Sequence, residues 1–166
     1  MESTFDEIGF LLDLQRLLQE ATDLDNEFEN DSIRILERAL EANDLNDVTL
    51  PSIFLMCADQ WEQDWYGVQY PVLFAIVQEL LDSDDAGASM ADLDEGAATL
   101  RRKVVNVVKR LGPQEDGAFQ PASDALVNTC LIKNNRATIH TPPDENGRQY
   151  AVPAFIALYD IGLPQD

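Results

Sequence analysis

Residues 70–81 read YPVLFAIVQELL, and the position of this apolar stretch decides how the rest of the chain is arranged. One set of its side chains recurs at steps of three and four, the spacing of a helix face: Leu73, Ile76, Val77, Leu80 and Leu81. A second set makes the other faces apolar: Val72, Phe74 and Ala75. Pro71 suits a first helical turn. The pattern therefore predicts a central helix over this stretch.

Helices are also predicted over residues 5–21, 33–43, 51–66 and 89–111. Within 51–66, side chains recur at helical steps: Phe54, Cys57, Ala58, Trp61 and Trp65. Within 89–111, apolar residues alternate at steps of four and three, the spacing of a packed seam: Leu93, Ala97, Leu100, Val104, Val107 and Leu111. The helix over 5–21 is apolar beyond one face, so we expect it to be central or docked on a partner.

The last third of the chain predicts β-structure. Residues 136–141 and 148–152 alternate in polarity around the turn sequence PPDENG, which indicates a hairpin. Pro153 lacks an N–H, so the second strand is expected to be an edge strand or to end there. Residues 121–133 fit a helix or a strand, and PAFIALYDIG (153–162) fits a short helix or a third strand.

The expected fold is mainly α, a bundle of about five helices with a small C-terminal β-hairpin. The expected division is an acidic helical domain over 1–82, a linker or helix start over 83–96, and a basic helix plus hairpin over 97–166, packed on the first domain. Seven apolar side chains are expected to be nearly buried: Phe54, Trp61, Leu73, Ile76, Val77, Leu100 and Val104.

Charge is distributed unevenly along the chain. The 166 residues carry 31 acidic and 11 basic side chains, a net charge of −20. Residues 1–95 hold 24 acids and 3 bases, whereas residues 96–166 hold 7 acids and 8 bases. A partner or nucleic acid facing the second half would explain this difference, as would simple variation between domains.

The composition, with three lysines against eight arginines and a large acid excess, resembles that of proteins from extreme halophiles and their viruses. This resemblance implies adaptation to high salt, which screens charge over a few ångströms. No stretch approaches the roughly 20 apolar residues that span a bilayer, and the N-terminus lacks the basic start of a signal peptide. We therefore expect a cytoplasmic protein, or a virion protein if viral, with no membrane partner.

Few side chains suit catalysis or metal binding. One histidine and two cysteines are too few for the common zinc sites, and no glycine-rich phosphate loop is present. His140 alternates along a predicted strand, and Cys57 and Cys130 lie in apolar runs where thiols pack as small hydrophobes. We expect no enzyme activity, no metal and no cofactor.

The helix over 89–111 carries the clearest candidate contact residues for nucleic acid or a partner: Arg101, Arg102, Lys103, Asn106, Lys109 and Arg110. At 100° per residue, all but Arg101 fall on one arc opposite the apolar seam. This stripe either contacts phosphates or pairs with acidic protein, in the same chain or in a neighbouring subunit. A group of aromatic residues is a second candidate partner contact: Trp61, Trp65, Tyr66 and Tyr70.

An apolar helix (70–81), a linker, a basic helix (97–111) and a later hairpin loosely resemble the element order of a winged-helix domain. This resemblance implies a nucleic-acid-binding transcriptional regulator that uses the basic helix and the hairpin. Two other functions are compatible with the chain. One, which we favour, is a non-catalytic protein-interaction or assembly subunit, whose partner is another protein or a further copy of the chain in a homo-oligomer. The other is an acidic inhibitor or nucleic-acid mimic that covers a basic protein.

Overall fold

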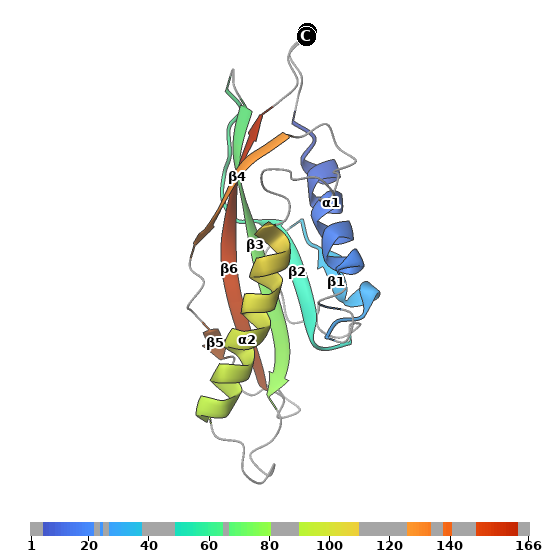
Figure 1. Ribbon diagram of the computed structural model, residues 1–166, viewed down its shortest axis with the longest axis vertical. Helices are drawn as coiled ribbons and strands as arrows, with labels where there is room; N and C mark the ends of the chain where they lie inside the picture. Colours follow the sequence, from blue (N-terminus) through green and yellow to red (C-terminus); the bar gives the residue numbers. More distant parts are fainter. Residues whose placement is uncertain are drawn as a thin grey trace.

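The computed structural model describes residues 5–21, 24, 27–37, 49–64, 67–80, 90–109, 126–133, 138–140 and 149–162. These residues form two helices, a short 3-10 helix and six strands (Figure 1). Their bounds in chain order are α1 (Glu7–Glu20), η2 (Asn30–Ser32), β1 (Ile33–Ile35), β2 (Ser52–Cys57), β3 (Gly67–Leu80), α2 (Met90–Val108), β4 (Leu126–Lys133), β5 (Thr138–His140) and β6 (Gln149–Gly162). No helix among them is both long and apolar enough to cross a membrane.

The strands form a sheet in the order β1-β2-β3-β6-β4, with β5 also paired to β6. β1 is parallel to β2, and the other neighbouring pairs are antiparallel. Because β3 occupies one side of β6 along nearly its whole length, β4 and β5 share the other side. Elements from the first half of the chain thus form one side of the sheet, and β6, β4 and β5 form the other (Figure 1).

The predicted helical bundle is wrong, because the described structure is a mixed α/β fold with two α-helices. β1, β2 and β3 occupy residues where the second, third and fourth helices were expected. In β3, Phe74 and Ile76 are buried on one face of the sheet, and Ala75 and Val77 are buried on the other. A strand buried on both faces is apolar at every position, so its periodicity does not distinguish it from a buried helix.

The C-terminal prediction was partly confirmed. β5 pairs with β6 in antiparallel register, as the predicted hairpin requires, and residues 126–133 form the strand β4. β6, however, continues through Pro153 for 14 residues and lies inside the sheet. In the pairing of β6 with β3, Ala75 pairs with Ala154, and the next described pair is Gln78 with Ala151. The proline therefore interrupts the pairing without ending the strand. The winged-helix order also fails, because its expected first helix is β3.

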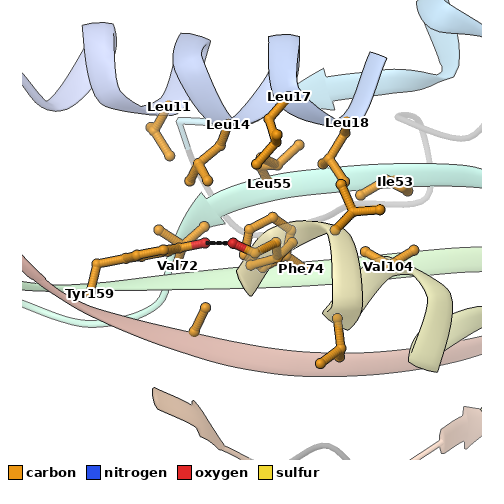
Figure 2. Close-up of a cluster of buried hydrophobic side chains, with 14 of the residues drawn as sticks. Leu11, Leu14, Leu17, Leu18, Ile53, Leu55, Val72, Phe74, Val104 and Tyr159 are labelled. Atoms are coloured by element: carbon orange, nitrogen blue, oxygen red, sulfur yellow. Dashed lines mark hydrogen bonds between the residues drawn. The ribbon is translucent and has the colours of Figure 1, made fainter. Parts of the chain in front are cut away.

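Two of the predicted helices, over 5–21 and 89–111, were confirmed as α1 and α2. The Asp6 carboxylate caps α1 by accepting a 2.9 Å hydrogen bond from the Gly9 N–H. Both helices pack on one face of the sheet, here called the inner face (Figure 1). Figure 2 shows leucines of α1 directed toward side chains of β2, β3 and α2 in the largest hydrophobic core.

The opposite face, here called the outer face, has its own smaller buried cluster: Phe54, Met56, Ala75, Val77 and Tyr150. Leu36 and Leu50 pack against this cluster from the segment around β1 and the start of β2. Of the seven residues predicted to be core, five are buried: Phe54, Ile76, Val77, Leu100 and Val104. Trp61 and Leu73 are half-buried.

Candidate interaction surface

The part of the outer face formed by β3, β6 and β4 carries contiguous apolar side chains. Strand pairing places Leu73 beside Ile156, and Leu158 between Pro71 and Leu131. Leu131 is 55% exposed, and the other four are half-buried. We call these five residues the outer patch: Pro71, Leu73, Leu131, Ile156 and Leu158.

One cation and one anion mark the two ends of the outer patch. Asp160 pairs with Thr129 at one end, and Lys133 pairs with Ile156 at the other. Alternation along the strands puts the side chains of Asp160 and Lys133 on the same face as Leu131. Four residues of strand separate the two ends, a distance of about 13 Å at ~3.3 Å per residue. The lysine is exposed and the aspartate is half-buried.

The candidate contact residues of α2 divide into exposed and engaged side chains. Arg102, Asn106 and Lys109 are exposed at spacings of four and three, so they form a stripe on the solvent side of the helix. Lys103 instead forms a 2.7 Å ion pair with Glu27.

Arg101 is buried and donates a 3.3 Å hydrogen bond to Thr138 Oγ1 of β5. Burial lowers the pKa of its guanidinium. This arginine therefore ties α2 to the sheet, and Arg110 lies outside the described residues.

The described members of the aromatic group lie in the inner core. Tyr70 is buried, and its ring makes edge contacts with Trp61 at 5.6 Å and Phe10 at 5.8 Å between centroids. Phe5 packs edge-on against Trp61 at 5.3 Å. These contacts tie α1 and the loop after β2 to the sheet, whereas Trp65 and Tyr66 lie outside the described residues.

Two tyrosine hydroxyls and the Cys57 thiol donate hydrogen bonds, whereas the buried Ser52 Oγ has no hydrogen-bond partner among the described residues. The Tyr70 hydroxyl donates to Glu7 Oε1 at 2.6 Å, and burial together with this carboxylate raises the pKa of Tyr70. The Tyr159 hydroxyl donates to the Val108 carbonyl at 3.4 Å (Figure 2), and burial raises its pKa too. Cys57 Sγ donates to the Asp59 carbonyl at 2.9 Å.

Burial raises the pKa of the Cys130 thiol to about 11, with smaller opposing contributions from Tyr159 and Lys109. A thiol with such a pKa stays protonated at neutral pH and is a poor nucleophile. Both cysteines are free. Among the described residues, no group of three or more His, Cys, Asp or Glu side chains is placed to hold a metal ion.

His140 lies on β5 opposite Ala151. A smaller apolar patch lies on α1, where Ile8 and Leu12 are 53% and 50% exposed on successive turns. Leu11, which lies between them in the sequence, is buried. The outward face of α1 is therefore apolar over one turn.

Exposed charge follows the two sides of the sheet. Among the side chains that the structure describes, the exposed acids all precede residue 81: Asp6, Glu20, Glu29, Asp31, Glu37, Asp59, Glu62, Asp64 and Glu79. The exposed cations all follow it: Arg102, Lys109 and Lys133. Among the described side chains, the exposed acids therefore lie on the elements before residue 81, and the exposed cations lie at α2 and on β4. The acidic loop after β2 adjoins the outer patch, because the Ala58 N–H donates to the Pro71 carbonyl at 3.0 Å.

The outer patch was not predicted from the sequence. Its residues come from three segments, 71–73, 131 and 156–158, that only the strand pairing brings together. The available signal was in residues 154–161, which are apolar at both odd and even positions up to Leu158. No protein-family model matches the chain, and no curated protein sequence matches it significantly.

Proposed function

We propose that this protein is a non-catalytic protein-interaction or assembly subunit, adapted to high salt, that binds its partner through the outer patch. The exposure of Leu131 carries the proposal. This side chain is 55% exposed and adjoins Leu158, which is half-buried and paired with Pro71 on its other side. An isolated exposed leucine is ordinary, but a contiguous apolar patch on a folded surface is typical of interaction sites.

The charge pattern of the outer patch also supports a protein partner. The centre of a protein interface is depleted of charge, whereas its rim is polar. Between Asp160 at one end and Lys133 at the other, the patch residues are all uncharged. The nine exposed acids among the described residues all lie outside these positions.

The stripe on α2 favours protein over nucleic acid as the partner. Among the described residues, its exposed face offers two cations, Arg102 and Lys109, in a protein of net charge −20. Affinity for duplex nucleic acid comes largely from cations that neutralise phosphates, and each cation contributes to it. Two cations suit the polar rim of a protein interface better.

Photo-crosslinking tests this proposal. Leu131 is replaced by the photoreactive benzoylphenylalanine, and the protein is irradiated both pure and in extract of the source cells at high salt. The matched control carries the same group at Glu20, an exposed position at the end of α1. We expect discrete protein adducts from position 131, weaker adducts when the same chain also carries Leu158→Asp, and no adduct from position 20. Position 131 yielding no adduct in either sample would contradict the proposal.

A further inference from the structure

We propose that the partner of the outer patch is a second copy of this chain, related by a twofold axis that runs across the strands. The inference rests on the proposed function and names its partner. Two outer faces would then pack sheet on sheet, as in β-sandwiches, with the apolar side chains between them. Leu131 and Leu158 of one copy would meet the same residues of the second copy.

The net charge narrows the choice of contact face. Two copies of net charge −20 repel each other, so they associate best through the face that contributes least to this repulsion. The described exposed acids lie on α1, on η2 and after β1, in the loop after β2, and at the end of β3. The outer patch has one cation and one anion at its ends, so the charge of the patch itself is balanced. The acidic segment nearest to it is the loop after β2, where the Ala58 N–H donates to the Pro71 carbonyl.

The order of these two charges makes the patch self-complementary. A twofold axis across the strands reverses the strand direction in the second copy. The Lys133 end of each copy then lies over the Asp160 end of the other, which gives two attractive charge pairs. An axis along the strands would instead bring the two Lys133 ends together and the two Asp160 ends together, so both attractive pairs would be lost. The charge pattern therefore selects the first arrangement.

The contact is small, so the dimer should be weak. Stable interfaces bury about 1,600 Å² in total, whereas this patch has five apolar side chains and two charges. We expect dissociation constants of about 1–100 μM, in the range of weak interfaces. Salt should strengthen the dimer, because molar salt shortens the Debye length to about 3 Å and removes the long-range repulsion.

Charge-swap variants test the arrangement. Lys133→Asp and Asp160→Lys are purified separately and studied by sedimentation velocity in 0.5 M KCl. Each homodimer would contain two repulsive pairs, so each variant should dissociate at least tenfold more readily than the wild type. In an equimolar mixture, Asp at position 133 of one chain meets Lys at position 160 of the other, and the second pair keeps the native residues. The mixture should therefore recover dimers.

Lys109→Asp and Glu20→Lys are the matched controls, since they make the same charge changes at exposed positions on or beside the helices that pack on the inner face. They should dimerise much as the wild type does, and circular dichroism checks that every variant is folded. A mixture of the two patch variants that associates no better than either alone would overturn the inference. So would a wild type that stays at 18.5 kDa. Adducts to another protein at position 131 would then leave the proposed function standing, and absence of any adduct would remove both.

Discussion

Replacing Phe74 by alanine is the sharpest test of the fold, because this residue lies on the inner face of β3 between its partners on β2 and β6. Phe74 is fully buried, pairs across strands with Leu55 and Phe155, and stacks on the latter at 5.0 Å with an 11° interplanar angle. Removing a buried Phe side chain costs about 3–5 kcal/mol, of which the aromatic pair accounts for roughly 0.5–1.5 kcal/mol. With a urea m-value of about 2 kcal/mol/M, a loss of ~4 kcal/mol lowers the unfolding midpoint by about 2 M.

The assay is urea unfolding followed by circular dichroism in 1 M KCl at low protein concentration, where dimers contribute little. Leu12→Ala is the control, because Leu12 is a large apolar residue that is 50% exposed. Its substitution should change the free energy of unfolding by no more than about 0.5 kcal/mol. A Phe74→Ala midpoint that shifts by no more than the Leu12→Ala midpoint would refute the placement of β3 between β2 and β6.

Three other predictions follow from charge and burial. The thermal midpoint in scanning calorimetry should rise from about 0.01 M to 1 M KCl as self-repulsion is screened, and a flat or falling midpoint would contradict adaptation to high salt. Arg101→Ala should lower the free energy of unfolding in urea by about 1–3 kcal/mol, because it removes a buried side chain that is hydrogen-bonded to Thr138. Arg102→Ala, at an exposed position, should change this free energy by no more than ~0.5 kcal/mol, and equal effects of the two substitutions would contradict the structural role of Arg101. The pKa of the Cys130 thiol is about 11 in the folded protein, against an ordinary value of 9.0, so the folded state holds this proton more tightly than the unfolded state. The free energy of unfolding should therefore fall as pH rises from 9 to 11, and it should fall less steeply in Cys130→Ala. Identical pH slopes in the two proteins would show that the thiol does not cause the fall.

The two helices were predictable because each has one apolar face. In α1, Leu14, Leu17 and Leu18 are buried on the side that faces the sheet, while Asp6 supplies a recognisable cap. In α2, Val104 and its seam neighbours are buried while Arg102 is exposed. An amphipathic helix keeps its period because one side faces water.

The central strands were not predictable from period alone. Ile53, Phe54 and Leu55 in β2 are all fully buried, alternately on the inner and the outer face. The apolar stretches of β2 and β3 therefore lack the alternation of apolar and polar residues that identifies a half-buried strand. Length and the branched Val and Ile residues of β3 were the remaining signals for a strand.

The candidate surface was predictable only in part. The arc on the fifth predicted helix grouped Arg102, Asn106 and Lys109, which the structure shows exposed on one side of α2. The outer patch depends instead on the register that joins Leu73 to Ile156 and Leu131 to Leu158, residues far apart in the chain. Nothing local in the sequence specifies that register.

Sedimentation equilibrium of the wild type and Leu131→Asp, run side by side in 1 M KCl from about 1 to 200 μM, tests whether the outer patch binds a second copy of the chain. The wild-type mass should rise with concentration from 18.5 kDa toward twice that value. Leu131→Asp should stay at the monomer mass, because it places a carboxylate at the centre of the apolar contact. A wild type that remains monomeric at every concentration, or a Leu131→Asp variant that dimerises equally well, would contradict dimerisation through the outer patch.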